Sequence, residues 1–167
     1  MFALLNDINY LLNEEPFKRD EGHYYAVVLT PESAEKVEEL AIYDDIPKYH
    51  VTISFEPTVK IAEQLSQLID RSLVIQANGL YDNGNVNALF ISEMKFKKNG
   101  QLLKKIDAGP NVKPGPAHIT VSLRKGHKRR ESNQMLLDYM KNPPQPDSPQ
   151  YRLINMKLDG VFQRLQK

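Results

Sequence analysis

Apolar and polar residues alternate most regularly in two short segments of the chain, 50–55 and 118–123. In both segments every second side chain is large and apolar, and the side chains between them are polar. Because the side chains of a strand point alternately to its two faces, this period predicts two strands that each have one apolar and one polar face. A third segment, 24–29, is rich in β-forming residues and predicts a buried strand.

Helices are predicted where apolar residues recur at helical spacing. One helix is expected to begin at Pro31 and to end before Asp44, and a second is expected to follow Thr58 as its cap. Residues 2–12 and 129–141 also carry apolar side chains on one helical face. These helices alternate with the strands along the chain.

The second half of the chain adds further strands to this pattern. Strands are predicted at 73–76 and 87–92, and the segment 151–165 is expected to form a pair of strands. Residues 94–106 fit either a hairpin at Asn99–Gly100 or a helical turn, and both alternatives stay open. The order of elements predicts an α+β fold, with helices outside two sheets.

Length and composition restrict the class of protein. The 167 residues fit a single domain, which we expect over 23–167, preceded by an N-terminal helix and connector over 1–22. The absence of cysteine excludes disulfides, thiolate zinc sites and cysteine nucleophiles. No apolar run approaches the ~20 residues of a membrane span, and the N-terminus lacks the basic region of a secretory signal. We therefore expect a cytoplasmic protein that is not associated with a membrane and has no obligate protein partner.

The two alternating segments are copies of one pattern, in which His, Thr and Ser occupy successive polar positions. The first copy contains His50, Thr52 and Ser54, and the second contains His118, Thr120 and Ser122. An ordinary solvent-exposed strand face is rich in Lys and Glu, and these faces are not. We expect the two polar faces to meet across one groove that holds both imidazoles and both threonine hydroxyls.

These residue types suit the cleavage of a phosphodiester. Cleavage needs a base for the proton of the attacking water or hydroxyl, an acid for the leaving oxygen, and donors for the phosphate oxygens. The ordinary pKa of histidine is ~6.5, so one imidazole can be neutral and the other charged near neutral pH. Threonine hydroxyls can donate to the nonbridging oxygens as charge builds there. The scheme requires no metal and no other cofactor.

Paired His-x-Thr strands about half a domain apart resemble the signature of the 2H phosphoesterase superfamily. The likeness covers residues 24–162, and within the superfamily it is closest to the cyclic phosphodiesterase domain of fungal-type tRNA ligases. The stretches that carry this closer likeness are Tyr24–Val27, Pro116–Val121 with Arg124, Glu131–Asn133 with Leu136–Leu137, and Leu158–Val161.

The resemblance implies two pseudo-symmetric lobes of antiparallel sheet, with the motifs lining a central cleft. It implies that His50 and His118 act as acid and base, in either order, and that Thr52 and Thr120 hold the phosphate. The implied substrate is an RNA-type phosphodiester, most directly a nucleotide or RNA-end 2′,3′-cyclic phosphate. Because no ligase or kinase domain accompanies the motifs, we do not expect a complete tRNA ligase.

Two alternative functions stay open. Stand-alone 2H proteins of similar size include viral enzymes that degrade cyclic di- or oligonucleotide defence signals, and the same histidines would serve that reaction. A non-catalytic module that binds a nucleotide or an RNA end is the second alternative. The intact pair of His-x-Thr motifs favours an enzyme over such a module.

Further residues are candidates for substrate binding. Arg124 lies in phase with the polar face of the second strand, so its guanidinium is expected to point into the cleft and bind phosphate. Tyr24 or Tyr25 can stack on a base. Ser54 and Ser122 lie on the same polar faces as the histidines.

Basic residues flank both motifs and are expected to attract an anionic substrate, because the net charge of the whole chain is only +1. They are Lys48, Lys113 and the run Arg124–Arg130. Residues 111–116 are expected to form a loop beside the cleft. The two remaining histidines, His23 and His127, are expected at the surface or rim.

Overall fold

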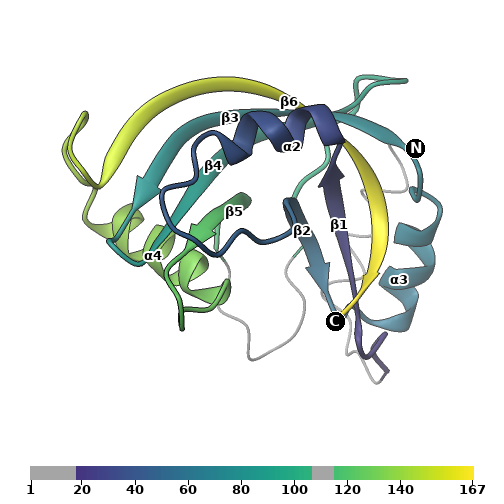
Figure 1. Cartoon of the computed structure of the whole chain (residues 1–167). Coiled ribbons are helices and arrows are strands. Elements are labelled where there is room, and N and C mark those ends of the chain that lie inside the picture. The colour runs from purple at the N-terminus through teal and green to yellow at the C-terminus, as the bar shows by residue number, and fades with distance from the viewer. Residues whose placement is uncertain (1–17, 107–114) are drawn as a thin grey trace.

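The computed structural model describes residues 18–106 and 115–167, which form one six-stranded antiparallel sheet and three helices (Figure 1). The strands are β1 (His23–Leu29), β2 (His50–Phe55), β3 (Ser72–Asp82), β4 (Val86–Phe96), β5 (His118–Leu123) and β6 (Tyr151–Gln166). The helices are α2 (Pro31–Glu38), α3 (Val59–Ser66) and α4 (Arg130–Lys141). The helix expected at 2–12 lies outside the described residues.

The alternation of apolar and polar positions has the predicted consequence over the first four residues of β2 and of β5, and it is broken after them. Val51 and Ile53 of β2 are fully buried, and so are Ile119 and Val121 of β5. The histidine and the threonine of each motif are half-buried on the other face. The buried faces belong to one apolar core, which also includes residues of α2 and α3.

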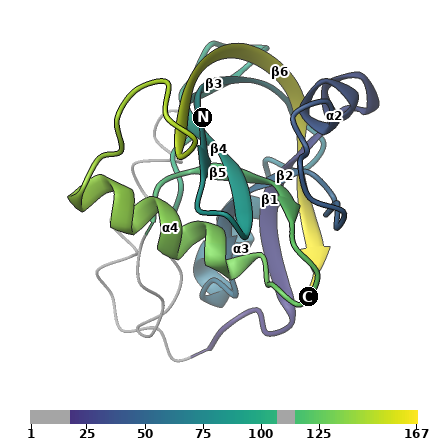
Figure 2. The same cartoon turned by 60° about the vertical axis from the view of Figure 1, so that its left-hand side comes forward.

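The sheet curves until its edge strands come close to each other (Figures 1 and 2). Its strand order is β2-β1-β6-β3-β4-β5, so the edge strands are the two that carry His-x-Thr. The hydroxyl of Tyr49 donates to the carbonyl of Val121 at 3.0 Å. Beyond it, Asp45 and Leu123 exchange two backbone hydrogen bonds of 3.1 and 2.9 Å. These contacts hold β2 and β5 side by side.

One continuous sheet replaces the two sheets that the sequence predicts. The segment 151–165, expected to be a pair of strands, is the single strand β6, which pairs with β1 on one side and with β3 on the other. Gly160 allows β6 to continue as one strand and to pack closely against β1. A Cβ atom at Gly160 would lie 2.5 Å from Val27 Cγ1 and 3.0 Å from the Val28 carbonyl oxygen.

The helix starts follow their predicted caps. The side chain of Thr30 accepts a hydrogen bond from the Ser33 amide at the start of α2, and Thr58 accepts one from the Ile61 amide at the start of α3. The segment 94–106 contains the hairpin alternative, because β4 continues to Phe96 and a turn follows. α4 packs on β4 and β5 through a second, smaller apolar cluster. None of the described helices is long and apolar enough to cross a membrane.

Candidate active site

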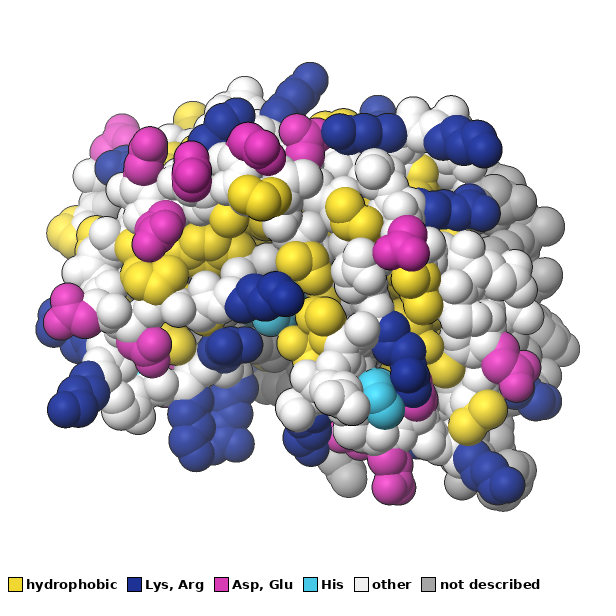
Figure 3. Space-filling view, turned by 45° about the vertical axis from the view of Figure 1, so that its right-hand side comes forward, with side chains coloured by type: hydrophobic (Ala, Val, Ile, Leu, Met, Phe, Trp, Pro, Cys, Tyr) yellow, Lys and Arg dark blue, Asp and Glu magenta, His cyan; other side chains and the backbone are white. Residues whose placement is uncertain are grey.

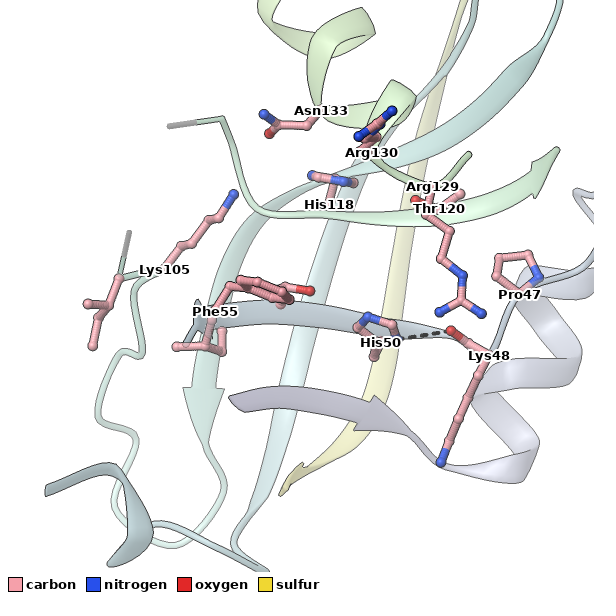
Figure 4. A pocket seen from close by; sticks show the side chains of 13 residues that line it. Pro47, Lys48, His50, Phe55, Lys105, His118, Thr120, Arg129, Arg130 and Asn133 are labelled. Atoms are coloured by element: carbon pink, nitrogen blue, oxygen red, sulfur yellow. Dashed lines mark hydrogen bonds between the residues drawn. The ribbon is translucent and has the colours of Figure 1, made fainter. Parts of the chain in front are cut away.

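A cavity of about 320 Å³ lies between β2, β5 and the start of α4 (Figure 4). It is lined by His50, Thr52, Ile53 and Phe55 of β2, His118 and Thr120 of β5, Pro47 and Lys48 before β2, Lys105 and Ile106 after β4, and Arg129, Arg130 and Asn133 of the α4 region. Both His-x-Thr motifs therefore contribute to the same cavity. The closeness of edge strands β2 and β5 brings them together.

The two imidazoles are oriented by equivalent hydrogen bonds. His50 Nδ1 lies 3.0 Å from the carbonyl oxygen of Lys48, and His118 Nδ1 lies 2.8 Å from that of Pro116. A carbonyl oxygen can only accept, so Nδ1 carries the proton in each neutral ring. In both rings Nε2 is then the atom that can accept a proton.

The surroundings favour the neutral form of both imidazoles. Burial lowers the pKa of His118 to about 4, against the hydrogen bond to Pro116, and the cationic Lys105 and nearby His50 add to the lowering. Burial also lowers the pKa of His50, although the hydrogen bond to Lys48 opposes it, and Arg129 contributes to the lowering. An anion in the cavity would act in the opposite direction and stabilise protonated imidazole.

The two threonines lie two residues beyond their histidines on the same strand faces. Thr52 and Thr120 both line the cavity. The hydroxyl of Thr120 is 2.8 Å from that of Ser132, a fully buried residue of α4. Ser132 therefore restricts the direction in which the Thr120 hydroxyl points.

Four basic side chains line the cavity, and none of its described lining residues is acidic. Lys48 and Arg129 lie near His50, and Arg130 lies on the α4 side above His118 (Figure 4). Lys105 donates to the carbonyl oxygen of Gly115 at 3.0 Å, next to the Pro116 carbonyl that holds His118. Basic side chains also surround a recess with a histidine ring in Figure 3. This charge distribution favours an anionic ligand.

Several cavity residues were not predicted from the sequence as ligand contacts. Lys105 follows the ambiguous hairpin, and Asn133 was noted only as part of the stretch Glu131–Asn133, without a role. Phe55 was expected in the core with the other apolar residues of its strand. It instead lines the cavity half-buried, because the pairing of β1 with β2 shifts register between Tyr25 and Ala26. The alternation of faces in β2 therefore changes after Ile53, and Ser54 is buried in place of Phe55.

The tyrosine candidates lie in different surroundings. The ring of Tyr24 is half-buried, and its centroid is 5.6 Å from that of His50, at the side of the cavity. Tyr25 is only 1% exposed and packs on Phe162 in the core. Tyr25 is therefore not available to a substrate.

The serine and arginine candidates do not line the cavity. Ser54 is buried. Ser122 is also buried, and its hydroxyl accepts from two amides of the loop before β2 and donates to Asn87. Arg124 bonds to the carbonyl of Gly84 and covers the ring of Tyr43. The alternation of β5 is already broken after Val121, where the pairing with β4 shifts register, and the strand ends at Leu123.

The remaining candidates are metal ligands, Lys113 and the two histidines outside the motifs. Among the described residues, no group of three or more His, Asp and Glu side chains is placed to hold a metal ion. Lys113 and most of the loop 111–116 lie outside the described residues. His23 and His127 do not line the cavity. The Nδ1 atom of His127 lies 2.8 Å from a carboxylate oxygen of Glu131.

Comparisons with known proteins give a likeness of fold. No family model matches the chain, and no curated protein matches it. Among solved structures, the chain is similar to a fungal RNA kinase, with a TM-score of 0.51 and 16% sequence identity. The match covers 90% of this chain and 46% of that one, so this chain spans about half the length of the kinase structure. The chain therefore has the fold of a part of that protein.

Proposed function

We propose that the chain is a metal-independent 2H phosphodiesterase that hydrolyses RNA-type phosphodiesters, most directly 2′,3′-cyclic phosphates of nucleotides or RNA ends. The observation that carries this proposal is the pair of imidazoles in one cavity. His50 and His118 both bond through Nδ1 to the carbonyl two residues upstream, and both leave Nε2 for proton exchange.

The proposed reaction uses one imidazole as base and the other as acid. Nε2 of the base takes a proton from water, whose oxygen forms a new bond to phosphorus. The bond from phosphorus to one ribose oxygen breaks, and Nε2–H of the acid gives that oxygen its proton. The product is a phosphomonoester. The base is left protonated and the acid deprotonated, and proton exchange with solvent restores both imidazoles for the next cycle.

The other cavity residues suit the charge that develops in this reaction. The hydroxyls of Thr52 and Thr120 can donate to the nonbridging oxygens. Lys105 and Arg129 lie near His118 and His50, respectively, and favour the anionic phosphate. When the phosphate binds, its charge raises the pKa of the imidazoles, so one of them can carry the proton that the leaving oxygen needs.

The two halves of the sheet support the likeness to 2H phosphoesterases. In one half, His50 at the start of β2 is paired with Val28 of β1. In the other half, His118 at the start of β5 is paired with Phe90 of β4. Each motif thus lies on an edge strand that is antiparallel to its inner neighbour. The fungal protein of similar fold is an RNA kinase, which agrees with RNA as the substrate proposed here.

The proposal is tested with nucleoside 2′,3′-cyclic phosphates and cyclic dinucleotides as substrates, in EDTA, by chromatography of the products. We expect hydrolysis of the 2′,3′-cyclic phosphates. His50→Ala and His118→Ala should each lower kcat by about 10²-fold or more, because each removes a proton-transfer group. His23→Ala is the matched control, since this histidine lies outside the cavity, and it should retain full activity.

Each contrary result has a separate meaning. Full activity in either cavity variant would remove that histidine from the mechanism. Loss of turnover in EDTA would contradict the metal-free scheme. Hydrolysis of cyclic dinucleotides alone would replace the substrate class, and tight binding of a cyclic phosphate without turnover would identify a binding module.

A further inference from the structure

A second cavity, of about 330 Å³, lies beyond the end of β5. It is lined by Ile42, Tyr43, Asp44, Arg124 and Lys125. None of these residues lines the cavity that holds the two histidines. The proposed hydrolysis therefore does not use this second cavity.

The two cavities share two walls. The loop 42–48 supplies residues to the second cavity at its beginning and to the histidine cavity at its end. The segment 123–130 does the same, with Arg124 in the second cavity and Arg129 in the first. Between the cavities, Asp45 and Leu123 join the two segments through a pair of backbone hydrogen bonds. We call residues 42–48 and 123–130 the basic seam.

The basic seam concentrates positive charge. Its six basic residues, all exposed, are Lys48, Arg124, Lys125, Lys128, Arg129 and Arg130. Its two acidic residues are Asp44 and Asp45. The formal charge of the basic seam is thus +4, although that of the whole chain is only +1. A single cyclic phosphate carries one negative charge, so most of this positive charge is in excess of what the histidine cavity requires.

Arg124 is fixed in a position that suits a nucleic acid. Its Nε donates to the carbonyl of Gly84, and its guanidinium carbon lies 4.8 Å from the centre of the Tyr43 ring. The Tyr43 ring is held in turn, because its hydroxyl donates to Asp82 at 2.6 Å. A planar guanidinium supported in this way can bind a phosphate through its remaining N–H groups or stack on a base.

We propose that the second cavity is a subsite for the RNA strand upstream of the phosphate that is cleaved. This inference rests on the proposed function and adds the substrate class: a single-stranded RNA end of several nucleotides. A strand that ends in a cyclic phosphate continues only on its 5′ side, so it leaves the histidine cavity in one direction. The basic seam offers that path, from Arg129 to Arg124 and Lys125.

The subsite is tested by fluorescence anisotropy with single-stranded RNA that ends in a 2′,3′-cyclic phosphate, at several salt concentrations. The RNA has about 12 nucleotides, within the site sizes of single-strand-binding grooves, and the cyclic mononucleotide is measured by competition. His118→Ala is the background, so that the RNA is not cleaved. We expect the RNA to bind more tightly than the mononucleotide.

The variant Arg124→Ala/Lys125→Ala should weaken RNA binding about 10-fold at low salt and leave mononucleotide binding unchanged. It should also reduce the slope of log K against log salt by about 1.4, the value for two lost phosphate contacts with a single strand. Lys125→Glu alone leaves the contacts of Arg124 with Gly84 and Tyr43 in place and should weaken RNA binding in the same direction. Lys95→Ala/Lys157→Ala is the matched control, with two exposed cations removed from the sheet away from both cavities.

Three results would overturn the subsite. The first is equal affinity for the RNA and the mononucleotide, and the second is a loss of RNA affinity in Lys95→Ala/Lys157→Ala as large as that in Arg124→Ala/Lys125→Ala. The third is that Arg124→Ala/Lys125→Ala weakens binding of duplex DNA of the same length as much as binding of RNA, which would show general attraction of polyanions. Failure of the phosphodiesterase proposal is distinguishable, because binding does not depend on turnover. If the native protein cleaves none of the substrates but binds RNA through Arg124 and Lys125, the hydrolysis is rejected and the strand subsite is retained.

Discussion

Each imidazole of the cavity bonds at Nδ1 to a backbone carbonyl, and this single contact determines which atom can exchange protons. For His50 the carbonyl belongs to Lys48, and for His118 it belongs to Pro116. In both cases the partner is only two residues away in the chain. The orientation of each ring is therefore set locally, while burial and the surrounding cations set its pKa.

The lowered pKa values predict the pH dependence of the proposed hydrolysis. The free protein must carry one proton on the imidazole pair, so kcat/KM falls as pH rises above both pKa values and also as pH falls below both. Since burial lowers the pKa of His118 to about 4 and that of His50 below 6.5, we expect kcat/KM to reach its maximum below pH 6.5. Steady-state kinetics across the pH range measure the pH at which kcat/KM is maximal.

The profile of kcat provides an internal control for this prediction. Bound phosphate raises the pKa of the imidazoles, so the profile of kcat should lie at higher pH than that of kcat/KM. Lys105→Met removes a charge that lowers the pKa of His118 and should move the kcat/KM profile to higher pH. A maximum of kcat/KM above pH 6.5 in the unchanged protein would contradict the assignment.

At the residue scale, the sequence predicts the repeated part of the site and little else. Both His-x-Thr motifs could be found because they repeat within one chain and have the period of a strand. Lys105 could not, because its place beside His118 depends on how a hairpin packs. Arg124 was expected in the same cavity as the motifs, but β5 ends one residue before it.

Among the elements, β6 determines the form of the sheet. It is hydrogen-bonded to β1 and to β3, and it therefore joins the two pairs of strands that carry the motifs. Local signals predicted the helix starts at Thr30 and Thr58, since a capping side chain acts within three residues. They did not predict that 151–165 is one strand, because this depends on pairing with strands far away in the sequence.

Gly160→Ala tests how closely β6 must approach β1. A methyl group at this position would lie 2.5 Å from Val27 Cγ1, so β6 or β1 would have to move. We expect a loss of about 1–3 kcal/mol in the free energy of unfolding, as is typical of overpacked sites. Urea denaturation measures this loss. Lys157→Ala, an exposed position of the same strand, is the control and should stay within about 0.5 kcal/mol of the unchanged protein; equal stability of the two variants would contradict the close approach.

For the whole molecule, the important contact is the one between the edges of the sheet. Tyr49 is 6% exposed, and its hydroxyl donates across the edges to the carbonyl of Val121. This contact lies beside the two histidines in the sequence, one residue before His50 and three residues after His118. The distance between the two motifs therefore depends on it.

Tyr49→Phe should affect both stability and activity. Loss of the hydroxyl leaves the carbonyl of Val121 without this donor, at a cost of about 1–2 kcal/mol in the free energy of unfolding. Because the two histidines must stay aligned, we expect kcat to fall by about 10-fold. Thermal unfolding and steady-state kinetics measure the two effects.

Tyr139→Phe is the matched control for this prediction. It removes a comparable hydrogen bond, from Tyr139 to the carbonyl of Asp82 at 2.9 Å, whose acceptor belongs to the inner strand β3 and which does not join the edges of the sheet. It should lower stability to a similar extent and leave kcat unchanged. A similar fall of kcat in both variants would show that the contact of Tyr49 has no special part in aligning the site.

The continuity of β6 has a kinetic consequence. Its sixteen residues join both halves of the sheet by backbone hydrogen bonds, so the halves cannot swing apart without breaking part of the ladder. Hinge motion between these two halves of the described sheet then does not gate entry, and ligand capture becomes an encounter with β2 and β5 already in place. The association rate should accordingly be set by diffusion and by electrostatic steering, and it should decrease as ionic strength rises.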